Sequence, residues 1–250
     1  MKQESLQKTY WDEIWQPTSK WGVLSRLRKK KFSYAALQNW ERDIFHEIST
    51  RMGSGDKLLS VGCGRALIDY WLAVVFNIDV HLLDISWPLL QKVGNSFGKV
   101  RHHIYHHDAL SLPFSDNTFD VVWNEGVWEH FEENDMITGI REMSRVSKKW
   151  VVVDVPFSKS KPYTLAMDYL KRNNLWIYGK EDPKETLVPY FRKAGLEVVM
   201  ERPIGSVQVC KNYLNMIPDE AARKKIMEQL APEDYSVFPH LLTIGEKKLS

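Results

Sequence analysis

The spacing of apolar positions changes repeatedly along the chain from residue 57 onward. Short apolar runs that suit buried strands alternate with longer stretches in which apolar residues recur every three or four positions, as on one face of a helix. The predicted strands are residues 57–62, 79–86, 100–109, 120–126, 149–157, 196–204 and 240–248, and the predicted helices are residues 66–76, 88–97, 135–146, 184–195 and 219–230. This alternation predicts an α/β fold, a doubly wound and mostly parallel sheet with helices on both faces.

The last apolar run, residues 240–248, follows a long connection, so it could pair antiparallel at an edge of the sheet. Two other stretches look like additions to the alternating core. Residues 1–50 read as helical, because their apolar side chains are spaced by three and four, and residues 157–182 follow the fifth predicted strand. We therefore expect one domain over residues 1–250, with residues 1–50 as an N-terminal helical cap and residues 157–182 as an insertion.

Composition narrows the class of protein. The chain has 250 residues, of which 44% are hydrophobic and 26% charged, as in soluble globular proteins. The formal net charge of +2 gives no global basic field that would favour nucleic acid. Cys63 and Cys210 are far apart, and the first residues lack the apolar core of a signal peptide. These features predict a reduced, cytoplasmic protein, and no apolar run has the length of a transmembrane segment.

The basic run RLRKKK, residues 26–31, is interpreted as the solvated face of a helix. Contact with a phosphate or a membrane surface is the alternative.

Glycines and acids stand at the ends of two consecutive predicted strands. Residues 58–66 read LLSVGCGRA and residues 81–86 read HLLDIS, so Gly62 and Gly64 follow one strand and Asp84 ends the next. Glycine lets the backbone turn sharply and approach a ligand without a Cβ atom in the way. An acid about 20 residues after such glycines accepts hydrogen bonds from ribose hydroxyls in nucleotide-binding βαβ units. The pattern predicts a nucleoside site.

Two common nucleotide motifs do not fit this site. A dinucleotide fingerprint requires glycine or alanine three residues after Gly64, where this chain has Leu67. A P-loop requires a Gly-Lys-Ser/Thr sequence, which does not follow. The predicted cofactor therefore lacks a pyrophosphate.

Four stretches together resemble class I S-adenosylmethionine-dependent methyltransferases, and most closely the broad group that acts on small molecules. The resemblance covers roughly residues 55–200 and is carried by LLSVGCGRA, VHLLDIS, HHDALSLPFSDNTFDVVWNEGVWEHF and LVPYFRKAGLEVVMER, in the family's order. It implies a Rossmann-like, seven-stranded sheet with a reversed terminal strand. It also implies S-adenosyl-L-methionine as the cofactor and a small molecule as the methyl acceptor.

The resemblance also implies roles for individual residues. Gly62 and Gly64 would border the methionine part of the cofactor, Asp84 would hold the ribose, and Asp108 with Ala109 would face the adenine amine. Asn124 would close over the cofactor. The expected cofactor-binding residues are thus Ser60, Gly62, Cys63, Gly64, Asp84, Ile85, Asp108, Ala109 and Asn124. The family usually has an acid where Ser60 stands and a third glycine where Ala66 stands, so Ser60 offers a hydrogen-bond acceptor and no charge.

Several of these residues also have a purely structural interpretation. Gly62 and Gly64 could form a simple strand-to-helix turn, Asp84 could cap a helix, and Asp108 precedes a loop rich in turn formers. Cys63 is interpreted as a small buried filler and not as a nucleophile.

Candidates for catalysis and acceptor binding follow the fourth and fifth predicted strands. Glu129 and His130, close to Glu125, could supply a base if the acceptor loses a proton, although this Glu-His pair tends to be structural in the family. Four aromatic residues could line an acceptor pocket, including cation–π contact with an amine, or could simply pack: Tyr163, Tyr169, Trp176 and Tyr178. Trp11 and Trp15 could form part of a lid or belong to the core.

The run HHIYHH at residues 102–107 raises the question of a metal. Strand alternation places His103 and His107 on one face and His102 and His106 on the other, and no third ligand is evident nearby. We therefore expect surface or packed histidines and no metal. Asp154 lies inside a predicted strand, where pairing with the backbone or a lysine is expected.

The sequence favours methyl transfer to a small molecule by a protein that holds donor and acceptor in line. A protein methyltransferase and a non-catalytic binder of the cofactor remain alternatives. Nucleic-acid methyltransferases that modify base amino groups usually carry a proline-aromatic tetrapeptide where this chain reads NEGVWEH, residues 124–130, so no nucleic acid is expected. The acceptor, the methylated atom and the oligomeric state stay open.

Overall fold

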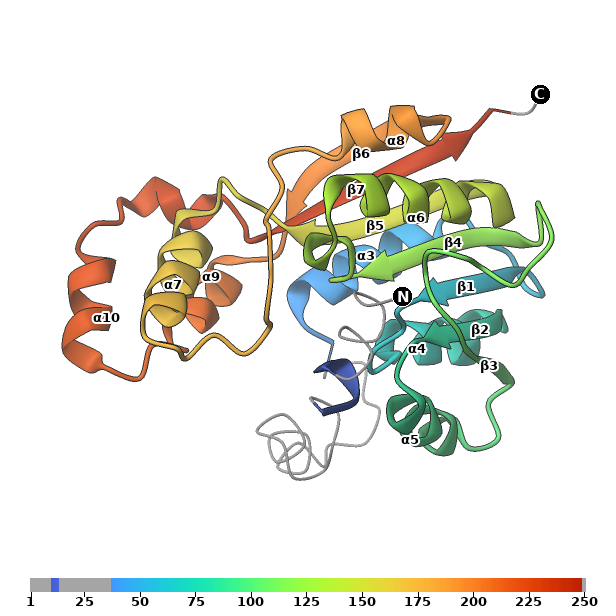
Figure 1. The fold of residues 1–250 in the computed structure, drawn as a ribbon, viewed down its shortest axis with the longest axis horizontal. Coiled ribbons are helices and arrows are strands. Elements are labelled where there is room, and N and C mark those ends of the chain that lie inside the picture. The colour runs from blue at the N-terminus through green and yellow to red at the C-terminus, as the bar shows by residue number, and fades with distance from the viewer. Residues whose placement is uncertain (1–9, 14–36, 249–250) are drawn as a thin grey trace.

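The computed structural model describes residues 10–13 and 37–248, and its centre is a seven-stranded sheet (Figure 1). The strand order is β3-β2-β1-β4-β5-β7-β6. The strands are β1 (Lys57–Val61), β2 (Asp79–Asp84), β3 (His102–His106), β4 (Phe119–Glu125), β5 (Ser147–Pro156), β6 (Leu196–Ile204) and β7 (His240–Lys247). Strands β1 to β5 pair parallel, whereas β7 pairs antiparallel with β5 and β6. The doubly wound fold with a reversed last strand is confirmed.

The expected edge position of the last strand is wrong. β7 lies between β5 and β6, and β6 forms the edge. The burial of the two strands explains this order: the first six residues of β7 are all buried, whereas β6 exposes several of its residues. A strand that is apolar on both faces needs a neighbour on each side and a helix layer above and below.

Helices cover both faces of the sheet. On one face lie α3 (Asn39–Ser49), α4 (Leu67–Phe76) and α5 (Trp87–Phe97), and on the other lie α6 (Glu133–Val146) and α8 (Val188–Lys193). Alternate residues of one strand supply the two cores: Leu58 of β1 packs with the first layer and Leu59 with the second. None of the described helices combines the length and the apolar composition needed to span a bilayer.

The helix expected at residues 184–195 is shorter, since α8 covers only Val188–Lys193. The preceding residues are held by β6 instead. The Thr186 hydroxyl donates to Glu201 Oε1 at 2.6 Å, and the Leu187 amide donates to Glu201 Oε2 at 2.7 Å. These bonds hold Thr186 and Leu187 against β6, and the helix begins only at Val188.

A helical lobe lies beyond the carboxyl ends of β5 and β6 (Figure 1). It consists of α7 (Lys161–Arg172), α9 (Val207–Leu214), α10 (Glu220–Met227) and the 3-10 helix η3 (Pro232–Ser236), around a small core of Ala166, Leu214 and Ile217. The predicted insertion, residues 157–182, supplies only α7 and the following loop. The rest comes from the connection between β6 and β7, where α9 was not predicted.

The predicted N-terminal cap is described only in part. Residues 10–13 are helical and α3 is the helix expected before the sheet. Trp15 and the basic run at residues 26–31 lie outside the described residues.

Gly139 of α6 provides a test of the packing. A Cβ atom there would lie 1.9 Å from Cη2 of the buried Trp128, in the 3-10 helix η2 (Trp128–His130). We expect Gly139→Ala to lower the free energy of unfolding by about 1–3 kcal/mol, because the indole must shift in a closely packed core. Urea denaturation measures this change.

Gly94→Ala is the matched control, because Gly94 also lies in a helix, α5, and its Cβ would be 3.6 Å from the nearest atom. There we expect a gain of about 0.5–1 kcal/mol from helix propensity. Equal effects of the two substitutions would contradict the packing of Trp128 against α6.

Candidate functional site

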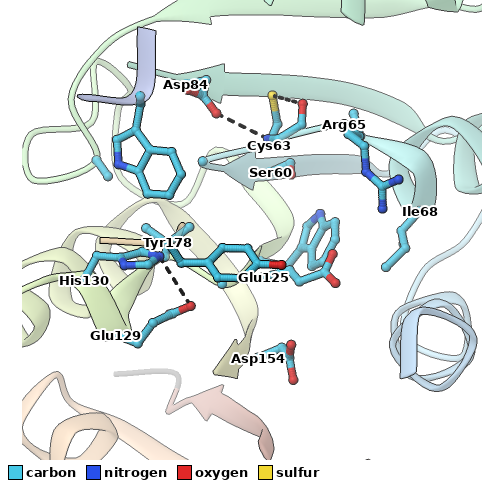
Figure 2. A pocket seen from close by; sticks show the side chains of 18 of the residues that line it. Ser60, Cys63, Arg65, Ile68, Asp84, Glu125, Glu129, His130, Asp154 and Tyr178 are labelled. Carbon is cyan, nitrogen blue, oxygen red and sulfur yellow. Dashed lines mark hydrogen bonds and ion pairs between the residues drawn. The ribbon is translucent and has the colours of Figure 1, made fainter. Parts of the chain in front are cut away.

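A pocket lies at the carboxyl ends of the parallel strands (Figure 2). Its lining comes from the ends of β1, β2, β4 and β5, the start of β7, helices α3 and α4, and the helical lobe. Parallel strands deliver their last residues to one edge of the sheet, which is where open α/β sheets bind ligands.

The turn after β1 is built from two glycines with left-handed backbones. Gly62 has φ +67° and Gly64 has φ +51°. The Gly62 and Cys63 amides both donate to the Leu83 carbonyl, at 2.8 and 3.0 Å, and so tie this turn to the end of β2. A Cβ atom on Gly64 would meet no described atom within 4 Å, whereas one on Gly62 would lie 2.6 Å from Val127 Cγ2. The turn therefore leaves open space beside Gly64.

Asp84 ends β2 beside this turn. Its Oδ1 accepts from the Ser86 amide at 2.9 Å and its Oδ2 accepts from the Gly64 amide at 3.3 Å. Burial raises the pKa of Asp84 to about 6, although these amides favour the ionised form. Ile85 lines the pocket beside it.

Three other predicted residues line the same part of the pocket. Asp108 and Ala109 follow β3, and Asp108 Oδ1 accepts from the Leu110 amide at 2.9 Å, so it also shapes a turn. The Cys63 thiol is buried and its pKa is raised well above the usual value by burial and then by Asp84. A neutral thiol is a poor nucleophile, which agrees with a packing role.

Ser60 has an acidic neighbour that sequence reasoning missed. Asp69 of α4 is fully buried and lines the pocket with Ser60. Its Oδ1 accepts from Trp123 Nε1 at 2.9 Å, and its Oδ2 has no partner among the described residues. Burial raises the pKa of Asp69 to about 7, and the hydrogen bond from Trp123 acts against this rise. An acid in the first turn of the otherwise apolar LIDYWLAVVF was the available signal.

Four carboxyl groups gather at the other end of the pocket: Glu125, Glu129, Asp154 and Glu181. Glu125 and Asp154 are register partners at the ends of β4 and β5. Glu125 Oε1 accepts from Trp40 Nε1 at 2.7 Å, and Asp154 Oδ2 is paired with His240 Nδ1 at 2.9 Å. The partner of Asp154 is thus a histidine, and the expected pairing with a lysine or the backbone is wrong.

His130 and Glu129 face the pocket together from η2. His130 Nδ1 donates to the Lys180 carbonyl at 2.5 Å, which leaves Nε2 without a proton in the neutral ring, 3.6 Å from Glu129 Oε1. Burial lowers the pKa of His130, whereas burial and then Glu181 raise that of Glu129 well above its usual value. In the absence of a charged ligand, both shifts favour the neutral form of each group.

Comparisons with known proteins agree with this geometry. A family model for a methyltransferase domain matches residues 59–152. The demethylmenaquinone methyltransferase of Staphylococcus haemolyticus is 32% identical over 124 residues, which cover 46% of this chain and 48% of that protein. Phosphoethanolamine N-methyltransferase 3 of Arabidopsis thaliana is 24% identical over 186 residues, which cover 72% and 37%. The chain thus spans about half or less of the length of these curated relatives.

Solved structures show the same fold. A chain of the complex between the Haloferax volcanii Trm112 methyltransferase activator and a methyltransferase superposes with a TM-score of 0.67 at 19% identity, covering 95% of this chain and 98% of that chain. Over residues 59–152 the chain is therefore similar to methyltransferase domains, and it shares the fold of solved methyltransferase structures. The matched residues 59–152 include the glycine turn, Asp84 and Asp108.

The predicted aromatic residues divide into two groups. Trp176 and Tyr178 line the pocket, as does Trp11 of the N-terminal segment, which meets His130 edge to face at 5.0 Å between ring centroids. Tyr163 stands behind the lining and its hydroxyl donates to Glu181. Tyr169 packs instead against the core of the helical lobe. The structure thus brings two of the four to the pocket.

Asn124 is not among the residues that line the pocket. Its side chain is buried, and both of its polar atoms lack a partner among the described residues. The alternation of β4 explains this, because Trp123 and Glu125 share the pocket side and Asn124 points the other way.

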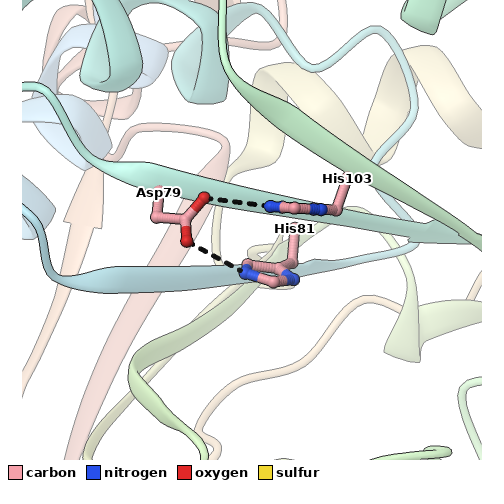
Figure 3. A group of neighbouring side chains, drawn as sticks. All are labelled: Asp79, His81 and His103. Carbon is pink, nitrogen blue, oxygen red and sulfur yellow. Dashed lines mark hydrogen bonds and ion pairs between the residues drawn. The ribbon is translucent and has the colours of Figure 1, made fainter.

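A separate cluster lies at the opposite ends of the strands, where Asp79 starts β2 (Figure 3). Asp79, His81 and His103 place ligand atoms within 4.8 Å of one another. The expectation that His103 lacks further ligands nearby is therefore wrong, since the neighbouring strand supplies them. However, Arg101 already lies 3.1 Å from Asp79 Oδ2, and the two imidazole rings stack at 4.4 Å with an interplanar angle of 18°. The nitrogen lone pair of an imidazole lies in the plane of its ring, so the two stacked rings of His81 and His103 do not point their lone pairs at one metal ion.

Glu125 gives a testable pH dependence. Burial, then Glu41 and Asp154, raise its pKa from 4.5 to about 8. Between these values the folded protein keeps a proton that the unfolded chain loses, so stability falls as the pH rises through this window. We expect Glu125→Gln to reduce the fall in unfolding free energy between pH 5.5 and 7.5, measured by urea denaturation.

Glu197→Gln is the control, because Glu197 is an exposed carboxylate on β6. That substitution should leave the pH dependence as in the wild type. A Glu125→Gln profile that follows the wild type would show that Glu125 ionises normally in the folded protein.

Proposed function

We propose that this protein transfers a methyl group from S-adenosylmethionine to a small-molecule acceptor bound between the ends of β4 and β5 and the helical lobe. The observation that carries the proposal is the division of one pocket into two ends. The glycine turn and Asp84 form one end, and the carboxyl-rich region at β4, β5 and β7 forms the other.

The residues at the first end fit an adenosyl group. Because Gly64 has no side chain, the open space beside it is free for part of the cofactor. Each carboxyl oxygen of Asp84 accepts one amide hydrogen bond and keeps a lone pair that a ribose hydroxyl can use. Ile85, Asp108 and Ala109 would border the adenine, and Cys63 the sugar.

Asp69 and Ser60 would hold the ammonium group of the cofactor. The unpartnered Oδ2 of Asp69 supplies the negative charge that Ser60 lacks. A charge-assisted hydrogen bond to an ammonium would also remove the cost of leaving that buried oxygen unpaired.

S-adenosylmethionine, when bound, supplies a methyl group on a positively charged sulfur. The chain must then orient the acceptor and exclude water. Trp11, Trp176 and Tyr178 cover the second end of the pocket and would exclude water there. If the acceptor has to lose a proton, the neutral His130 Nε2 is the group in this lining best prepared to take it, with Glu129 beside it.

The relatives support a small-molecule acceptor without agreeing on one. By their names, one acts on demethylmenaquinone and another on phosphoethanolamine, which differ in both charge and size.

Asp84→Ala tests the ribose assignment. We expect the substitution to weaken binding of S-adenosylhomocysteine by about 1–3 kcal/mol, because hydrogen bonds to a charged group are lost. Isothermal titration calorimetry measures the affinity. Asp168→Ala removes an exposed carboxylate of α7 and serves as the control. Unchanged affinity in Asp84→Ala would refute the ribose role, and a wild-type protein that binds no S-adenosylhomocysteine would refute the proposed function.

Asp69→Asn tests the ammonium assignment. We expect weaker binding of S-adenosylhomocysteine and unchanged binding of 5′-methylthioadenosine, because the second compound lacks the amino-acid group. Asp84→Ala should weaken both ligands, since both contain ribose. If Asp69→Asn affects the two ligands equally, Asp69 acts on the protein's structure and not on the ammonium group.

A further inference from the structure

We propose that the second end of the pocket is built to hold a positively charged amine, which makes the methyl acceptor a basic small molecule. An ammonium nitrogen has no lone pair, so methylation at that nitrogen requires that its proton first passes to a base of the lining, such as His130 Nε2. This inference rests on the proposed function, because it assumes that the cofactor occupies the end beside Asp84.

Acidic side chains outnumber basic ones at this end of the pocket. Glu125, Glu129, Asp154 and Glu181 face one space, as Figure 2 shows for the first three. Among the described residues of the lining, the basic side chains are Arg65, His107, His130 and His240.

Few of these basic groups can offset the four acids. Arg65 is paired with Glu41 at 3.4 Å, His107 follows β3 beside Asp108, and burial keeps His130 neutral. Only His240 sits among the acids with a raised pKa, since Asp154, Glu125 and Glu181 outweigh its burial. Behind the lining, Lys171 donates to the backbone carbonyl of Glu181 at 3.0 Å. The described part of the pocket therefore has an excess of acids.

Two carboxyl oxygens at this end are left without hydrogen-bond partners among the described residues. Glu129 Oε2 and Asp154 Oδ1 are buried and have no hydrogen-bond partner among the described residues. An unpaired buried carboxyl oxygen costs free energy, and a bound ammonium donates up to three hydrogen bonds. A cationic ligand would satisfy both the charges and these oxygens.

Aromatic side chains also line this pocket. Trp11, Trp40, Trp176, Tyr178 and Tyr213 all line the pocket. Trp40 stacks on His240 with 4.5 Å between ring centroids and an interplanar angle of 10°. Aromatic faces next to carboxylates attract alkylammonium groups, which need both a negative potential and an apolar contact for their methylene groups.

The four acids also lie far from the cofactor end. Asp84 is the last residue of β2 and Asp154 lies two residues before the end of β5, and β1 and β4 lie between these strands. Three strand spacings separate the two acids by about 14 Å. The cofactor's own ammonium already has Asp69 beside Ser60. The four acids are therefore not needed for the cofactor.

The test compares each cation with a neutral molecule of the same shape. Choline is paired with 3,3-dimethylbutan-1-ol, and benzylamine with benzyl alcohol, and each is titrated calorimetrically into wild-type protein saturated with S-adenosylhomocysteine at pH 7.5. We expect at least one cation to bind at least about tenfold more tightly than its neutral counterpart. If neither cation is preferred, the inference is wrong.

Binding of the cation should also release protons. Burial and mutual repulsion raise the pKa of Glu125 to about 8, and burial raises that of Glu181 to about 7. A bound cation favours the ionised carboxylates, so affinity should rise from pH 6 to pH 8. Titrations in two buffers of different ionisation enthalpy count the released protons.

Other groups that face these two acids set the size of the proton release. Glu125 faces Glu41 of α3, Glu129 of η2, Asp154 of β5 and His240 of β7. Glu181 faces Tyr163 of α7, Lys171 and His240, and its charge also acts on Glu129. Proton uptake on binding, or none, would contradict the inference.

Two isosteric variants locate the site. Glu125→Gln and Glu181→Gln should each weaken the preferred cation about tenfold and leave its neutral counterpart unchanged, because they remove a charge and keep the shape. Glu197→Gln, on exposed β6, is the control and should change neither.

S-adenosylhomocysteine binding separates the two proposals. A wild-type protein that binds this compound but shows no cation preference overturns only the inference about the acceptor. A wild-type protein that does not bind it overturns the proposed function. Retained S-adenosylhomocysteine binding in the glutamine variants shows that they are folded.

Discussion

The site depends on one constraint, which is that strands of the same direction end at the same edge of a sheet. β1, β2, β4 and β5 all end there, so the glycine turn, Asp84, Glu125 and Asp154 meet although up to 92 residues separate them in sequence. The antiparallel strand β7 begins, and does not end, at this edge of the sheet. Because β7 is antiparallel, its first residue pairs with the last residue of β5, and His240 arrives beside Asp154.

This arrangement places ionisable groups in a region from which water is largely removed. Burial raises the pKa of Asp69, Asp84, Glu125 and Glu129, because surroundings with little water disfavour the charged form of a carboxyl group. A core built only for stability would hold apolar residues at these positions. Their collection around one pocket, and not across the protein, indicates that ligands are expected to supply the missing partners.

The sequence was most informative where the relevant residues are close together along the chain. The glycine turn and Asp84 lie within one βαβ unit, so their spacing alone predicted a nucleoside site. The assignment of Asn124 to the cofactor site rested only on its position in the family pattern. Side chains alternate along β4, so Asn124 points to the face of the sheet opposite Trp123 and Glu125, which line the pocket. The position of β7 was missed because β6 and β7 are joined through 35 residues of lobe, whose path no local pattern specifies.

The two ends of the pocket differ in how the chain builds them, and this explains why the acceptor is harder to infer than the cofactor. The family match ends at residue 152, before Asp154, Glu181, Tyr213 and His240. These residues come from the end of β5, from the loop after α7, from α9 and from the start of β7, and the lobe that connects them was only half predicted. Proteins that bind the same cofactor need to have in common only the residues that form the first end of the pocket. The end of the pocket proposed for the acceptor is built by segments outside the matched residues 59–152. Relatives that match only those residues therefore carry little information about the acceptor. The charge and shape of this chain's own lobe carry most of that information.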